Sequence, residues 1–231
     1  MTTYTLGLAL EDFVPVILSS VGLFLITQMI LQVDEQLGRM AQAGWVLVTV
    51  GGLLKATWKL TMALTGGQTD LVWFDKGMFL WLAIGFTLLA MAMWQAAGMM
   101  RGKERPLRPW LYPAVPLALT LFAILSTGFP NLDVNSWRFV LLGIMTIGSV
   151  ALSVMLIQQA RRLGLTLAAV LFAVNIVVAF ILSGLARIPD QTIPLQWTEQ
   201  ILNTLSQGAF LYAAWQLVQT TVQQGKMALA T

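Results

Sequence analysis

The chain has 231 residues, of which 58% are hydrophobic and only 10% are charged, with a formal net charge of +3. Soluble domains carry about 25% charged residues, so this composition excludes an ordinary soluble domain and indicates a surface that faces lipid. The sequence contains no cysteine and no histidine, which excludes disulfides, a cysteine nucleophile and metal or haem sites built on histidine.

Seven apolar segments follow one another along the chain, each close to the roughly 20 residues that a helix needs to cross the hydrocarbon core. Polar turns rich in Gly, Pro, Asn and Asp separate most of them. Because an open strand cannot satisfy its backbone groups in lipid, we expect helices. The predicted fold is an all-α polytopic membrane protein, a single domain over residues 1–231 whose helices cover approximately 13–32, 45–65, 78–100, 110–128, 138–158, 165–186 and 197–219.

The basic residues predict the orientation of these helices, since cytoplasmic loops carry an excess of Lys and Arg. The loops on one side contain Arg39, Arg101, Lys103, Arg105, Arg108, Arg161, Arg162 and Lys226, whereas those on the other side contain Lys76, Arg138 and Arg187. The richer side is predicted to be cytoplasmic. We therefore expect a multi-pass protein of the cell (inner) membrane, with the N-terminus outside and the C-terminus in the cytoplasm.

The first and fifth segments are similar to each other. Residues 13–38 align without gaps on residues 139–164, and this places Gly22 on Gly148 and Gly38 on Gly164. The alignment predicts two three-helix units in the same orientation, joined by an inverting fourth helix, as in the parallel repeats of some transporters. Chance similarity between two leucine-rich helices is the alternative interpretation.

In helix count and orientation, this arrangement resembles the sugar-transporter and PQ-loop group, and also the seven-helix microbial rhodopsins. Pro15 is followed by Val16, so the Pro-Gln dipeptide of the first group is missing. A rhodopsin needs a lysine in its last helix for the retinal Schiff base, and the segment 197–219 contains none. The sequence therefore disfavours retinal binding, and we expect no cofactor.

Two lysines lie inside the second segment, within "GGLLKATWKL". Lys55 and Lys59 are four residues apart, so they share a helix face, with Gly51 and Gly52 one turn away. Lys55 is near the predicted midplane, where a lysine costs about 2.5–3.5 kcal/mol on insertion scales. The glycines allow another helix to approach closely. We therefore expect this face to point into the bundle, at a partner or at water.

Polar residues on later segments are candidate partners for these lysines. Glu199, Asn203, Ser206 and Gln207 form one stripe on the seventh segment, and Asn175 lies near the middle of the sixth. The prediction is that the second and seventh helices are close, with a lysine in reach of Glu199, Asn203 or Gln207. Asp12 and Asp75 are the next candidates.

This polar cluster has two interpretations. It is either a satisfied network that fixes helix register, or the lining of an outward-facing path on which the lysines attract an anionic or polar small molecule. The candidate path residues are Lys55, Lys59, Asn175, Glu199, Asn203 and Gln207.

The function hypotheses are a small transporter or channel with an outward-facing polar cavity near mid-membrane, or a non-enzymatic sensor or accessory subunit of a membrane complex. We predict no catalytic and no metal-binding residues, and no enzyme activity. Expected partners are the lipid bilayer and a membrane protein or a second copy of the chain, not nucleic acid. The loop "RGKERPLRP" is either an anchor that sets topology or a contact for anionic lipid headgroups.

Overall fold

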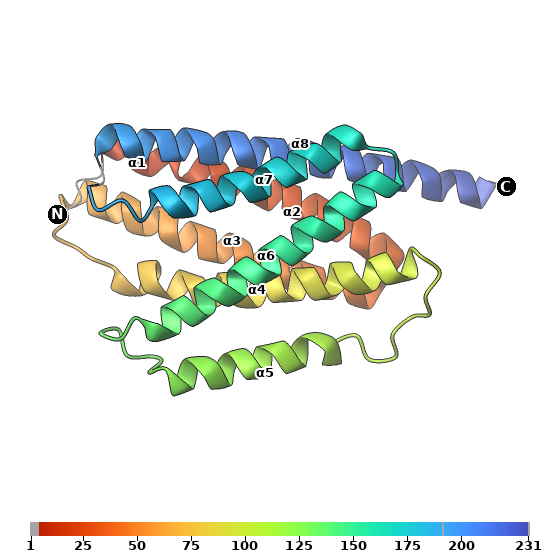
Figure 1. Ribbon diagram of the computed structural model, residues 1–231, viewed down its shortest axis with the longest axis horizontal. Coiled ribbons are helices and arrows are strands. Elements are labelled where there is room, and N and C mark those ends of the chain that lie inside the picture. The colour runs from red at the N-terminus through yellow and green to blue at the C-terminus, as the bar shows by residue number, and fades with distance from the viewer. Residues whose placement is uncertain (1–4, 191, 231) are drawn as a thin grey trace.

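The computed structural model describes residues 5–190 and 192–230, and in this part of the chain all regular structure is helical (Figure 1). The elements are α1 (Leu6–Glu11), α2 (Phe13–Val33), α3 (Glu35–Leu64), α4 (Val72–Met99), α5 (Leu111–Ser126), α6 (Ser136–Arg162), α7 (Thr166–Leu185) and α8 (Ile193–Ala230). Helices α1 and α2 meet at Asp12 and together correspond to the first predicted segment. The predicted all-α bundle is confirmed.

Five helical segments in the described residues are long and apolar enough to cross a membrane: Leu6–Val33, Glu35–Leu64, Val72–Met99, Ser136–Arg162 and Thr166–Leu185. The chain thus has the build of a membrane protein. The other two predicted spans do not meet this criterion. Helix α5 has 16 residues and is about 24 Å long, which is shorter than the hydrocarbon core. Helix α8 is long enough, but its polar side chains lower its hydropathy.

Several helices extend beyond their predicted limits, because hydropathy detects only the apolar part of a helix. The largest differences are at the end of α8, which reaches Ala230 and not residue 219, and at the start of α3, which begins at Glu35 and not near residue 45. Asp34 caps this helix by accepting a hydrogen bond from the backbone N–H of Leu37 at 3.0 Å. Arg39, which was predicted to lie in a loop, therefore belongs to α3 and pairs with Glu35 one turn earlier at 2.6 Å.

Six helices of the described chain pack in a closed ring, in the order α2, α3, α4, α6, α7 and α8, with α8 returning to α2. Helix α5 lies outside this ring, at the edge of the bundle, against α4 and α6 (Figure 1). In this order α2 is opposite α6, α3 is opposite α7, and α4 is opposite α8. The arrangement gives the ring an interior that all six helices can reach.

Helices α3 and α4 approach each other closely at a pair of glycines. A Cβ atom added to Gly44 would lie 2.7 Å from the backbone oxygen of Gly85, so both positions require glycine for this packing distance. Gly51, which the sequence marked as a close-packing position, lies against Leu82 of α4. Gly52, the other glycine of this face, lies against Val16 of α2, so the glycine face of α3 serves both neighbouring helices.

The ring is packed differently in its two halves. Towards the end where α2 finishes and α3 starts, its interior is filled by large buried side chains, including Met29, Ile30, Leu37, Met40, Met93, Leu156, Phe172 and Leu217. A smaller cluster around Trp137 and Ile124 holds α5 against the ring. Towards the end where α2 starts, the interior is open, and polar side chains lie among the apolar ones.

Candidate functional site

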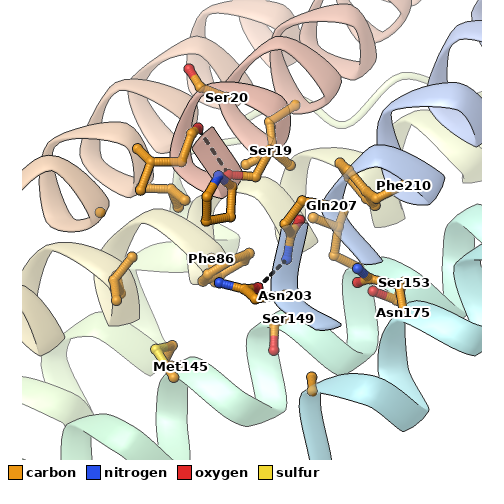
Figure 2. Close-up of a pocket in the computed structure, with 18 of the residues that line it drawn as sticks. Ser19, Ser20, Phe86, Met145, Ser149, Ser153, Asn175, Asn203, Gln207 and Phe210 are labelled. Atoms are coloured by element: carbon orange, nitrogen blue, oxygen red, sulfur yellow. Dashed lines mark hydrogen bonds between the residues drawn. The ribbon is translucent and has the colours of Figure 1, made fainter. Parts of the chain in front are cut away.

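A cavity of about 460 Å³ occupies the half of the ring nearest the start of α2 (Figure 2). Side chains from α2, α3, α4, α6, α7 and α8 line it, whereas α5 contributes none. The lining extends from Asp12 and Ser183, close to helix ends, to Phe86 and Phe210 in the middle of the bundle. Its volume is in the range of small-molecule sites.

Four of the six predicted path residues line this cavity: Lys55, Asn175, Asn203 and Gln207. Lys59 lies one turn further along α3 and reaches the cavity edge through its ion pair with Asp12. Glu199 is half-buried near the start of α8 and is not part of the lining. The structure thus brings residues from α3, α7 and α8 together around one space.

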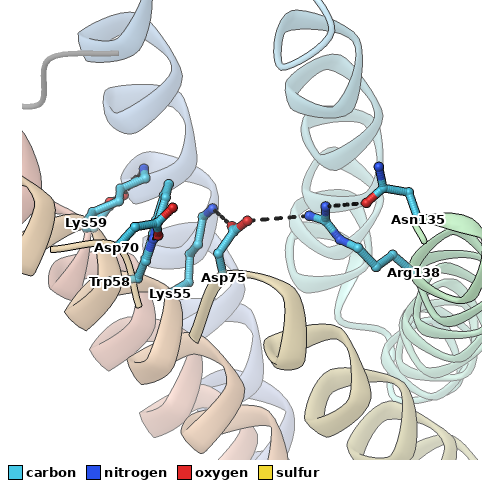
Figure 3. A network of polar contacts seen from close by, with 8 residues as sticks. Lys55, Trp58, Lys59, Asp70, Asp75, Asn135 and Arg138 are labelled. Carbon is cyan, nitrogen blue, oxygen red and sulfur yellow. Dashed lines mark hydrogen bonds and ion pairs between the residues drawn. The ribbon is translucent and has the colours of Figure 1, made fainter. Parts of the chain in front are cut away.

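Lys55 forms an ion pair with Asp75 of α4, and Asp75 also faces Arg138 of α6 at 3.5 Å (Figure 3). The ammonium group of Lys55 lies 4.1 Å from the centre of the Trp58 ring as well. The side chains of Lys55 and Asp75 are 32% and 21% exposed. This cation is therefore held by an opposite charge and an aromatic face before any ligand enters.

Lys59 pairs in the same way with Asp12 at the junction of α1 and α2, at 2.6 Å. Gln200 of α8 donates a second hydrogen bond to Asp12, and Thr204 donates one to the neighbouring Glu11. Asp12 thus joins α3 and α8 through one carboxylate.

The predicted packing of the second helix against the seventh is wrong, because the cavity lies between the two polar stripes and α3 and α8 are not neighbours in the ring. Helix α3 packs along α2 and α4, whereas α8 packs along α2 and α7. The ion-pair partners of the lysines are Asp75 and Asp12, which the sequence placed second among the candidates. A carboxylate compensates an ammonium charge in a poorly solvated site better than an amide does, and both aspartates lie at the start of helices next to α3.

Hydroxyl and amide groups form the deeper polar walls. Ser20 and Thr49 share a hydrogen bond of 2.9 Å between α2 and α3, and Asn175 donates to the hydroxyl of Ser206 at 2.8 Å between α7 and α8. The Gln207 amide donates weakly to Asn203 at 3.5 Å (Figure 2). In the described residues, the Asn203 amide nitrogen and the Gln207 carbonyl oxygen have no hydrogen-bond partner, so both can serve a ligand.

Two phenylalanines lie where the cavity meets the packed half of the ring. Phe210 of α8 packs over Gly22, where an added Cβ would lie 2.8 Å from the phenyl ring of Phe210. Gly148 lies against the main chain of α4 at Phe86, where an added Cβ would lie 3.1 Å from the backbone carbonyl carbon and the Cβ of Phe86. These two glycines are the pair that the internal alignment placed on each other. The contact at Gly22 joins α2 to α8, and the contact at Gly148 joins α6 to α4.

The sequence did not single out the serines of the cavity, or the hydroxyls of α6. Thr146, Ser149 and Ser153 follow at intervals of three and four residues in an otherwise apolar helix, so a search for polar helix faces would have found them. Ser153 is 8% exposed.

Comparisons of the chain with protein families, with curated proteins and with solved structures find no match.

Proposed function

We propose that this protein is a transporter or channel for a small uncharged polar solute, which binds in the cavity between the six helices of the ring. The observation that carries the proposal is the cavity itself: six helices line it, hydroxyl, amide and charged groups lie among its apolar side chains, and it ends against a packed core. A network that served only to fix helix register would need no such space, because packed interiors hold few voids larger than a water molecule.

The charges of the site favour an uncharged solute over the anion that two lysines would otherwise attract. Asp12 and Lys55 are the charged residues in the lining, and each has an opposite charge beside it. An anion would have to displace a carboxylate that the fold already holds next to the ammonium group. The amide groups of Asn203 and Gln207 offer one donor and one acceptor, and this suits a neutral solute with both kinds of group.

A parallel repeat is part of the proposal, with α2–α4 as one unit, α6–α8 as the other and α5 as the link. Three observations support it. The ring order places equivalent helices opposite each other. The aligned glycines Gly22 and Gly148 each pack against a phenylalanine of a neighbouring helix, Gly22 against the ring of Phe210 and Gly148 against the backbone and Cβ of Phe86. In the same alignment Ser19, Ser20 and Leu23 correspond to Met145, Thr146 and Ser149, and all six line the cavity.

Two such units around a central site support alternating access, in which one unit rocks against the other. The two seams that would move are α2 against α8 and α4 against α6. At the cavity end, the first seam carries the hydrogen bond from Gln200 to Asp12, and the second carries the contact between Asp75 and Arg138. We place the protein in the cell membrane, with the cavity facing outside and the C-terminus in the cytoplasm. The proposal includes no catalytic step.

The test is solute flux into liposomes that contain the purified protein, followed by light scattering after an osmotic step. The probes are glycerol, urea and erythritol as uncharged solutes, and formate as the anion. At least one uncharged probe should enter faster than into empty liposomes, and Gln207→Leu should slow it about ten-fold or more if a hydrogen bond in the path is lost.

Gln219→Leu is the matched control, because it makes the same change at an exposed position of the same helix and should leave the flux unchanged. Folded protein that passes formate but none of the uncharged probes would refute the proposed selectivity. Equal effects of the two substitutions would refute the assignment of the path.

A further inference from the structure

A second cavity, of about 210 Å³, lies at the opposite end of the bundle from the first. It is formed by the last turns of α4, the loop that follows, and the first turn of α5. The loop is the "RGKERPLRP" segment, whose charges the proposed solute path does not use. The charge, the floor and the rim of this cavity each restrict what can bind there.

The charged residues that line this cavity are Arg101, Lys103 and Glu104, which leave a net single positive charge. Arg105, in the same loop, is engaged elsewhere by an ion pair of 2.6 Å with Asp34. Arg101 and Lys103 form no ion pair in the described part of the chain. The cavity therefore carries two cations and one carboxylate, and none of the three is in an ion pair with another described residue. Their net charge of +1 matches a ligand with a single negative charge.

Gln95 is the polar residue of the cavity that lies in the body of α4, and its side chain is almost fully buried, with 6% of the residue exposed. Its amide nitrogen donates to the backbone oxygens of Met91, at 3.1 Å, and Pro109, at 3.3 Å. These bonds fix which way the amide points. Its carbonyl oxygen is buried and accepts no hydrogen bond from the described residues. A buried acceptor of this kind needs a donor, which a ligand with a hydroxyl group would supply.

Trp94 and Tyr112 form the rim on the lipid side. Their rings are 5.6 Å apart in an edge-to-face arrangement, and the two residues are 48% and 45% exposed. Tryptophan and tyrosine concentrate at the level of the lipid headgroups, where an apolar ring and a polar tip are both satisfied. Exposed apolar residues of α5, such as Val115 and Leu119, continue from this rim along the helix. A ligand with a polar head and acyl chains fits both regions.

We propose that this second cavity binds the headgroup of an anionic phospholipid whose phosphodiester carries a hydroxylated substituent, as in phosphatidylglycerol. The phosphodiester accepts hydrogen bonds from Arg101 and Lys103, and the headgroup hydroxyl donates to the carbonyl oxygen of Gln95. Glu104 disfavours a dianion such as a free phosphate monoester. The acyl chains pass over the exposed rings of Trp94 and Tyr112 onto the surface of α5.

The test is native mass spectrometry of the full chain in detergent, with three lipids of equal chain length added in turn. Phosphatidylglycerol is the expected ligand, phosphatidylmethanol keeps the charge but lacks the hydroxyls, and phosphatidylcholine has no net charge. We expect retention to fall in that order, with about a five-fold step for the missing hydroxyl. Arg101→Gln with Lys103→Gln should weaken phosphatidylglycerol binding about thirty-fold. Each basic residue near the headgroups contributes about five-fold in affinity, and the double variant removes two of them.

Arg161→Gln with Arg162→Gln is the matched control, since it removes the same charge from exposed positions at the same end of the bundle. It should leave binding within about two-fold of the wild type. Gln95→Leu should abolish the preference for phosphatidylglycerol over phosphatidylmethanol while keeping the preference of both over phosphatidylcholine.

Three results would overturn the proposal. If both double variants lose phosphatidylglycerol binding to the same extent, the lipid is held by the general positive charge of this surface and not by the cavity. Equal retention of phosphatidylglycerol and phosphatidylmethanol by the wild type would refute the role of Gln95, even if Gln95→Leu does not fold. Displacement of the lipid by millimolar glycerol 3-phosphate would show that the cavity takes a soluble phosphate.

Discussion

Asp75 should be more important for stability than either cation beside it, because it is the shared anion of the pair with Lys55 and the contact with Arg138. Replacing Asp75 with Asn leaves two partly buried cations without an opposite charge. Replacing Lys55 with Met removes one cation and leaves Asp75 facing Arg138. The two single substitutions therefore have unequal expected costs, although they break the same ion pair.

The magnitude follows from the exposure of the pair. Breaking a fully buried ion pair costs about 3–5 kcal/mol, and exposed pairs contribute about 0–1 kcal/mol. With side-chain exposures of 32% and 21%, the site lies between these limits. We expect Asp75→Asn to lower the free energy of unfolding by about 2–3 kcal/mol, and Lys55→Met by about 1 kcal/mol. The double variant should cost less than the sum, with a coupling of about 1 kcal/mol or more.

The assay is thermal unfolding of the purified protein in detergent, where 1 kcal/mol shifts Tm by about 2–4 °C for a chain of this length. Arg39→Gln is the control, because its pair with Glu35 is 70% exposed on both sides and should contribute only about 0.3–0.5 kcal/mol. If Asp75→Asn costs no more than Arg39→Gln, or if the two substitutions at the site are additive, the compensation of Lys55 by Asp75 is not what holds the lysine in the bundle.

The remaining predictions concern helix packing and orientation. Gly44→Ala should destabilise the protein by about 1–3 kcal/mol, because its Cβ would meet the backbone of α4, whereas Gly143→Ala has no atom within 4 Å and should leave Tm unchanged or slightly raised. Equal Tm values for the two variants would contradict the close approach of α3 and α4. A reporter inserted between Asn131 and Asn135 should be accessible from outside the cell, and one fused after Thr231, which lies outside the described residues, should be cytoplasmic. The reverse pattern would invert the proposed direction of the cavity.

The sequence by itself determined the class of the protein and the approximate position of its helices. Low charge and long apolar segments leave a chain few options other than a helical bundle in lipid, and this holds whatever the helices pack against. The spans at α5 and α8 were predicted less well, since hydropathy alone treats a short outer helix and a polar inner helix as ordinary spans. The helix ends that extend past the apolar segments, such as the Asp34 cap of α3, were also outside its reach.

The tertiary structure decided which polar groups meet. The sequence marked Lys55, Asn175, Asn203 and Gln207 as inward-facing, and all four line the cavity, because a polar group facing hydrocarbon is costly wherever its helix is placed. It ranked Glu199 ahead of Asp12 and Asp75 as the partner of the lysines, because the sequence does not show which helices are neighbours of α3. The choice of partner depends on the ring order, which is set by packing at positions such as Gly44 against Gly85 and Gly22 against Phe210, and not by the pattern of polar residues along any one helix.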